Sequence, residues 1–223
     1  MARLNEIFDY KDRTVDEYGT LINKLNIMDP ILLEQAERLI TSYKLYKLCL
    51  NDEENIAKRF DKEHFYSIHK YLFEDIYPFA GQTRNEPTTK SYTFCLPQYI
   101  DNNLNIVLMK ANKVYKSIKT KEDLVKFAAN LYSDLDFIHA FREGNGRCER
   151  EFVRQYVKKI VKEQGLDNYV IEYDKIKNKE EYNKAVVKAA ATLDTTELER
   201  ILSEITIISN DNQNKQTTKK TRR

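Results

Sequence analysis

Apolar and polar residues alternate along much of this chain with the period of an α-helix. Apolar side chains recur three and four positions apart, which places them on one face of a helix. Helices with this pattern are expected to begin near residues 29, 60, 97, 120 and 145. Two more are expected at about residues 173–191 and 195–208. The pattern therefore predicts a mainly α fold built as a helical bundle.

Several of these helices have typical terminal residues. Asp29 and Pro30 suit the N-cap and the first helical position. Thr120 with Asp123 resembles a capping box, and Gly165 suits a helix end. The first helix is expected to bury Leu32, Leu33, Ala36, Leu39, Ile40 and Tyr43.

Residues 82–96 have a different pattern. After a turn-like stretch at residues 85–90, polar and β-favouring side chains alternate at Ser91, Tyr92, Thr93 and Phe94. We therefore expect a short β-hairpin between two helices.

The composition is that of a globular domain with a strongly charged surface. Hydrophobic residues make up 41% of the chain and charged residues 32%, with a net charge of +2. Such a small net charge gives no strong general attraction to nucleic acid or to a membrane. No apolar run approaches the roughly 20 residues that a membrane-spanning helix needs, and the first residues lack the apolar core of a signal peptide. The three cysteines are widely spaced, which fits reduced thiols in a cytoplasmic compartment.

One domain is expected over residues 1–208, followed by a tail at residues 209–223. The tail contains no large apolar side chain and carries mostly basic charge. That composition predicts a disordered segment. An alternative interpretation makes the tail a contact for an acidic partner or an export signal.

The segment at residues 136–154 concentrates reactive and phosphate-binding side chains. Gly144, Asn145 and Gly146 form a turn before a predicted helix, where unpaired backbone N–H groups and the positive helix end favour an anion such as phosphate. Arg147 and Arg150 lie three positions apart and share a face of that helix. Their guanidinium groups can hold phosphate oxygens bidentately. This part of the segment therefore predicts a phosphate-binding loop.

Two further side chains of the same segment have chemical roles that fit such a loop. Glu143 at the edge of the turn can hold Mg²⁺, which takes one or two carboxylates together with substrate phosphates. His139, before the turn, can accept a proton near neutral pH. Cys148 also permits a Cys–His nucleophile, but a small packing residue is the simpler interpretation. His64 and His69 are five apart, on different faces of a helix, so a metal-binding pair is not expected.

The run His139-Ala140-Phe141-Arg142-Glu143-Gly144-Asn145-Gly146-Arg147-Cys148-Glu149-Arg150 resembles the signature of the Fic-domain AMP transferases. The family pattern is His-Pro-Phe-x-Asp/Glu-Gly-Asn-Gly-Arg-x-x-Arg. Ala140 is the one departure, because it stands where the family usually has proline. The likeness extends over about residues 20–165. It implies the Fic fold, a helical bundle with a β-hairpin flap beside the active-site loop.

The resemblance implies AMPylation, the transfer of AMP from ATP to a Tyr, Thr or Ser hydroxyl of a target protein. In this interpretation Asn145 contacts the α-phosphate, Arg147 the phosphates next to it, and Arg150 the γ-phosphate. Glu143 holds Mg²⁺, and His139 takes the proton of the attacking hydroxyl. The flap residues Ser91, Tyr92 and Thr93 would hold the target segment as an added strand.

Two comparisons within the family refine the expectation. A branch of kinases carries lysine at the place of Gly146, so the glycine favours AMP transfer. Many members carry an inhibitory helix with the pattern Ser/Thr-x-x-x-Glu-Gly/Asn, which this chain lacks: the residues four before Glu54 and Glu143 are Leu50 and His139. We therefore expect an antitoxin that inhibits in trans through a glutamate on Arg150, and a toxin role for this chain.

Some such toxins act on type II topoisomerases, which makes that enzyme class a candidate target in the bacterial cytoplasm. Two alternatives remain from the sequence. The chain can be an effector exported to a host cell, with the basic tail as its signal. It can also be a degenerate Fic fold that serves as a binding module, although His139 and Glu143 are both present.

Overall fold

The computed structural model describes residues 14–51, 56 and 58–209. It confirms a mainly α fold. Its helices are α1 (Pro30–Asn51), α2 (Lys62–Phe73), α3 (Ile100–Val114), α4 (Lys121–Ile138), α5 (Asn145–Gln164), α6 (Lys179–Thr192) and α7 (Thr196–Ile205). Short 3₁₀ turns lie at Pro97–Tyr99, Tyr115–Ser117 and Tyr173–Lys175. Beyond Ser209, the predicted basic tail lies outside the described residues.

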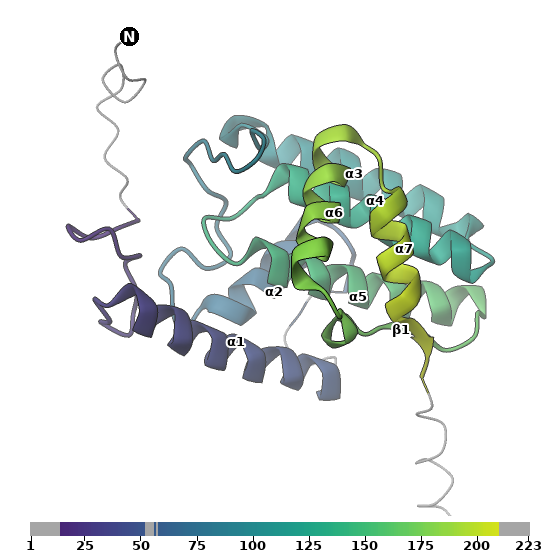
Figure 1. The fold of residues 1–223 in the computed structure, drawn as a ribbon, viewed down its shortest axis with the longest axis horizontal. Helices are drawn as coiled ribbons and strands as arrows, with labels where there is room; N and C mark the ends of the chain where they lie inside the picture. Colours follow the sequence, from purple (N-terminus) through teal and green to yellow (C-terminus); the bar gives the residue numbers. More distant parts are fainter. Residues whose placement is uncertain (1–13, 52–55, 57, 210–223) are drawn as a thin grey trace, which may run out of the picture.

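Helix α4 is the centre of the bundle. It contacts α3, α5, α6 and α7, while α2 packs on α5 and α1 lies along α2 at one edge of the molecule (Figure 1). Its predicted buried face is confirmed for Leu124, Phe127, Ala128, Leu131, Leu135 and Ile138. The capping box of Thr120 and Asp123 is also present. The loop after α4 is therefore attached to the most enclosed helix of the fold.

Two short strands were not expected from the sequence. Strand β1 (Tyr169–Ile171) pairs with β2 (Thr206–Ile208) in an antiparallel arrangement, with Ile171 opposite Thr206. Three residues per strand are too few to show an alternating pattern. The ladder ties the end of α7 to the segment after α5.

The predicted buried face of α1 was wrong at Leu32, Leu39 and Tyr43, which are 53%, 74% and 61% exposed. The N-cap was right, because the Asp29 side chain accepts from the backbone N–H groups of residues 31 and 32. The face that α1 turns inward carries Leu33, Glu37, Thr41, Lys44 and Leu48. Three of these five residues are polar, and their partners lie far away in the sequence, so hydropathy alone assigned the wrong face.

The flap is simpler than the predicted hairpin. Among the described residues of this segment, pairing is limited to one antiparallel bridge between Thr89 and Thr93. The backbone N–H of Phe94 also donates to the Thr88 carbonyl oxygen. The segment is a tight loop and has no extended strands.

None of the helices within residues 14–51 and 58–209 combines the length and the apolar character needed to cross a bilayer.

Candidate active site

The loop between α4 and α5 has an unusual backbone at both ends. His139 caps α4 in the left-handed region with φ 46°, and Gly144 caps the start of α5 with φ 80°. A Cβ atom on Gly144 would fall inside van der Waals contact with the Phe73 ring of α2. Glycine is therefore required there by both conformation and space.

Asn145 closes the loop on itself. Its Oδ1 accepts from the Phe141 N–H at 2.8 Å, and its Nδ2 donates to the Phe141 carbonyl oxygen at 2.7 Å. The residue is 3% exposed. Both ends of the side-chain amide therefore hold the loop, and a contact of Asn145 with the α-phosphate stays a prediction. Backbone N–H groups at a helix start are donors suited to phosphate.

His69 of α2 supports the same loop, a role that its place on a predicted helix did not indicate. Its ring stacks on Phe141 with centroids 3.7 Å apart. Its Nδ1 accepts from the Gly81 N–H at 2.8 Å, so Nε2 is the donor to the Glu143 carbonyl oxygen at 2.9 Å. Burial lowers the pKa of His69 to about 3, which keeps the ring neutral. Both ring nitrogens of His69 therefore have protein partners, and the absence of a His64–His69 metal pair stays a prediction.

His139 lies under the flap. Its ring is parallel to that of Phe94, with centroids 3.9 Å apart, and the residue is 8% exposed. Its backbone carbonyl oxygen accepts from Nε of Arg84 at 2.7 Å. Burial, with the nearby charges of Lys90 and Arg84, lowers the pKa of His139 to about 3. The imidazole is therefore neutral at physiological pH and has a lone pair that can take a proton.

Arg147 is engaged by helix α1. Its guanidinium pairs with the buried Glu37 carboxylate, and it donates to Thr41 Oγ1 at 3.2 Å. Glu143 Oε1 lies 3.4 Å from the same guanidinium and also accepts from the Gly144 N–H. These contacts explain why the inward face of α1 is polar.

A cleft of about 480 Å³ opens between α1 and the start of α5. Glu143, Arg147 and Arg150 of the motif line it, together with Glu37 and Tyr77. The predicted phosphate-binding and metal-binding side chains therefore meet in one cavity. His139 is not among its lining residues, since Phe94 covers the histidine ring.

The flap contacts the end of α4 through Tyr92 and Phe94. Ser91 and Thr93 are exposed, and Tyr92 is half-buried. The Tyr92 hydroxyl donates to Asp136 Oδ2 at 2.6 Å, and the Cys95 N–H donates to the Phe137 carbonyl oxygen. The exposed edge of the flap is thus held against the end of α4.

Cys148 is fully buried and its thiol donates to the Phe65 carbonyl oxygen. Burial raises the pKa of this thiol well above its ordinary value. A protonated, enclosed thiol is a poor nucleophile. The structure therefore favours the packing role over the Cys–His alternative.

Comparison with known proteins places these residues in a family. The Fic/DOC family matches residues 59–157, which include α4, the loop and α5 as far as Val157. A probable protein adenylyltransferase of Sinorhizobium fredii, y4lH, is 31% identical over 136 residues, covering 60% of this chain and 68% of that protein. The protein adenylyltransferase VbhT of Bartonella schoenbuchensis is 30% identical over 176 residues, 75% of this chain but only 33% of VbhT.

Solved structures share the fold. BepC of Bartonella tribocorum, a VirB-translocated effector with bound AMPPNP, superposes with a TM-score of 0.74 at 20% identity, covering 88% of this chain and 97% of that one. The N-terminal Fic domain of a Bartonella quintana effector superposes with a TM-score of 0.75 at 22% identity. The match covers 95% of this chain and 100% of that one. Both likenesses show a shared fold. The chain belongs to the Fic/DOC family.

Proposed function

We propose that this protein is an adenylyltransferase that moves AMP from ATP to a hydroxyl side chain of a target protein. One observation supports this most strongly. The motif residues Glu143, Arg147 and Arg150 line a single cleft at the start of α5, with the neutral His139 at the other end of the same loop. The proposal is also supported by the relatives, which are named protein adenylyltransferases, and by the AMPPNP bound to a protein of the same fold.

The residues have distinct parts in this reaction. Backbone N–H groups at the start of α5 and the two arginines hold the phosphates. The target hydroxyl oxygen forms a bond to the α-phosphorus, His139 accepts its proton, and the bond to pyrophosphate breaks. Arg147 must exchange part of its contact with Glu37 for a phosphate oxygen. The flap must expose His139, because Phe94 now covers the ring.

Mg²⁺ fits the donor set of the cleft. The Glu143 side chain is 41% exposed, and its Oε1 already accepts from the Gly144 N–H, which orients the carboxylate. One oriented carboxylate together with phosphate oxygens is a usual environment for Mg²⁺. The ion supplies neutralisation of phosphate charge when bound.

A labelling experiment tests the transfer. The purified protein is incubated with a bacterial lysate and with ATP labelled at the α-phosphate, in parallel with His139→Ala. Label is expected on protein with the wild type and none with the variant. Absence of α-label with the wild type, or transfer of γ-label in its place, would contradict AMP transfer.

We further propose that the chain acts as a toxin in the bacterial cytoplasm, restrained by a small antitoxin in trans. The sequence contains no Ser/Thr-x-x-x-Glu-Gly/Asn helix of its own. The cleft that contains Arg150 is open along α1, where a glutamate of a partner can reach the guanidinium. Helix α1 also exposes an apolar row at 3-, 4- and 7-residue spacing, suited to a partner helix: Leu32, Leu39, Tyr43, Tyr46 and Leu50.

Growth measurements test this role. Expression of the wild-type chain alone is expected to arrest bacterial growth, whereas His139→Ala is expected to be harmless. Mass spectrometry of type II topoisomerase subunits from the arrested cells tests that target. An isolated protein that stays inactive until its own terminus is cut would contradict inhibition in trans.

A further inference from the structure

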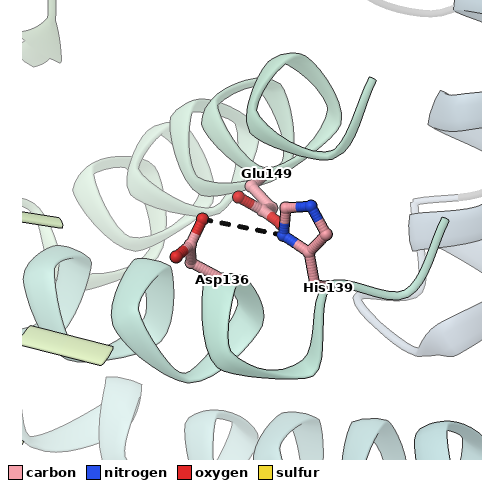
Figure 2. Close-up of side chains that lie close together, drawn as sticks. All are labelled: Asp136, His139 and Glu149. Atoms are coloured by element: carbon pink, nitrogen blue, oxygen red, sulfur yellow. Dashed lines mark ion pairs between the residues drawn. The ribbon is translucent and has the colours of Figure 1, made fainter. Parts of the chain in front are cut away.

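Three metal-ligating side chains converge behind the catalytic loop. Asp136 and His139 come from the end of α4, and Glu149 comes from α5, directly before Arg150 (Figure 2). One donor atom from each side chain lies within 4.8 Å of the other two. His139 Nδ1 and Asp136 Oδ1 are 3.9 Å apart, too far for a hydrogen bond. The cluster is distinct from the cleft, whose expected metal ligand is Glu143.

Two of the three side chains in this cluster have buried donor atoms without a protein partner. His139 Nδ1 and both carboxylate oxygens of Glu149 are buried without a hydrogen bond from any described residue. Glu149 is 0% exposed. A buried polar group without a partner costs about 1–3 kcal/mol, and a charged group costs more. Buried atoms without partners, close to the Asp136 carboxylate, are what an empty cation site would present.

We propose that Asp136, His139 and Glu149 form a binding site for a divalent transition-metal ion of the Zn²⁺ class. Imidazole nitrogen and carboxylate oxygen are both ligands of zinc in proteins, and three protein ligands leave a fourth position open. Donor atoms around tetrahedral zinc lie roughly 3.4 Å apart, given bonds of about 2.1 Å. The Asp136–His139 distance therefore needs to shorten by only about 0.5 Å.

The surroundings of the three donors suit a bound cation. The Tyr92 hydroxyl donates to the second oxygen of Asp136, which orients the carboxylate as outer hydrogen bonds do in metal sites. The imidazole is neutral, so Nδ1 can offer a lone pair. Two carboxylates match the charge of a divalent ion. The positive groups nearby are Arg84, Lys90 and Arg150, and they oppose the ion only in part.

Metal binding would prevent His139 from acting as the general base. An ion on Nδ1 leaves the remaining ring proton on Nε2, so the imidazole can no longer accept a proton from a target hydroxyl. The site therefore makes the enzyme sensitive to zinc at the same residue that performs proton transfer. This consequence rests on the proposed AMP transfer, whereas the binding itself does not.

Binding is tested without ATP or target. The full chain, stripped with a chelator, is titrated with Zn²⁺ by calorimetry and with Co²⁺ by visible absorption. One ion per chain is expected, with nitrogen and oxygen ligation in the Co²⁺ spectrum. Glu149→Gln and Asp136→Asn should each weaken binding at this site at least tenfold. Asp134→Asn is the matched control, because Asp134 lies on the same helix beside Lys110 and outside the cluster.

Several outcomes would overturn the proposal. One is the absence of binding by the wild type at millimolar Zn²⁺, which would mean that the two carboxyl groups share a proton and nothing more. Another is binding that neither variant weakens, which would place the ion elsewhere, for example at the exposed Cys49. Near-UV circular dichroism checks that each variant is folded. If the site binds zinc while AMP transfer fails, only the proposed function is wrong.

Discussion

At the scale of single residues, two glycines with positive φ meet different surroundings. Gly144 has φ 80° and faces the Phe73 ring, whereas Gly165 has φ 66° and has open space at its missing Cβ. Gly144→Ala is expected to lower the free energy of unfolding by about 3 kcal/mol, because backbone strain of about 1–2 kcal/mol adds to a clash of about 1–3 kcal/mol. Urea unfolding followed by circular dichroism measures the loss.

Gly165→Ala is the matched control for that substitution. It carries the backbone strain alone, so we expect a loss of about 1 kcal/mol. Equal losses for the two variants would show that Phe73 moves aside at no cost and that the close approach at Gly144 is not a requirement of the fold.

The motif and the site differ in how far the sequence could predict them. The sequence placed His139, Glu143, Arg147 and Arg150 near one another, because all four lie within twelve residues. The sequence could not reveal that the Glu37 carboxylate pairs with the Arg147 guanidinium, because the two residues are 110 positions apart. The contact of Asn145 with the α-phosphate stays a prediction, and only the folded loop shows that its side chain bonds to Phe141.

At the scale of elements, helices with one apolar face were predicted well and α1 was not. Helix α4 contacts other helices through apolar residues, so its hydropathy pattern predicts which of its residues are buried. Helix α1 contacts the motif through Glu37 and Thr41 and contacts α2 through Lys44, and it leaves apolar residues exposed. Hydropathy predicts the buried face of a helix correctly only where that face packs through apolar side chains. The flap was predicted as a hairpin but has a single bridge, and tertiary contacts of Arg84 and Tyr92 hold its position.

Helix α1 therefore influences the cleft through Glu37. This buried carboxylate accepts from Arg147 and from the Tyr77 hydroxyl. Glu37→Gln is expected to lower the free energy of unfolding by about 1.5–3 kcal/mol, the range for hydrogen bonds to charged groups. The same change removes a negative charge from the cleft and releases Arg147. ATP should then bind several-fold more tightly, as measured by calorimetry on the purified variant.

Glu34→Gln is the control on the same helix. Glu34 is exposed and pairs with Arg38, a contact worth roughly 0.5 kcal/mol or less. Glu34→Gln should therefore change the free energy of unfolding little. Weaker ATP binding by Glu37→Gln would mean that Glu37 orients Arg147 for phosphate, and the expected competition would be wrong.

At the scale of the whole molecule, the loop is held by helices on both sides of it. Helix α4 delivers His139, α5 provides the arginines, and α2 supports both through two buried histidines. His64 joins α2 to α5: Nδ1 accepts from the Phe60 N–H, and Nε2 donates to Gln155 Oε1 at 2.9 Å. Burial lowers the pKa of His64 to about 4. The bundle thus contains a neutral histidine, and protonation of its ring would disrupt the hydrogen bond that Nδ1 accepts.

That pKa predicts how the stability of the bundle depends on pH. Above the unfolded pKa of about 6.5, neither state is protonated and the contribution of His64 is complete. Between pH 6.5 and about 4 the unfolded chain binds a proton that folded His64 does not, so stability falls as pH falls. His64→Gln removes this proton linkage. The difference in unfolding free energy between wild type and variant should therefore shrink by up to about 1.4 kcal/mol per pH unit.

Urea unfolding at pH 7.5, 6.5, 5.5 and 4.5 measures this difference. Linkage from the other ionisable groups cancels when variant and wild type are compared at the same pH. Tyr156→Phe is the control: it alters a buried neighbour of Phe60 on α5 without a group that titrates in this range, so its effect should be constant. If the difference in unfolding free energy between wild type and His64→Gln also stays constant with pH, folded His64 takes up its proton as readily as the unfolded chain does. The junction of α2 and α5 would then not be what makes the bundle sensitive to acid.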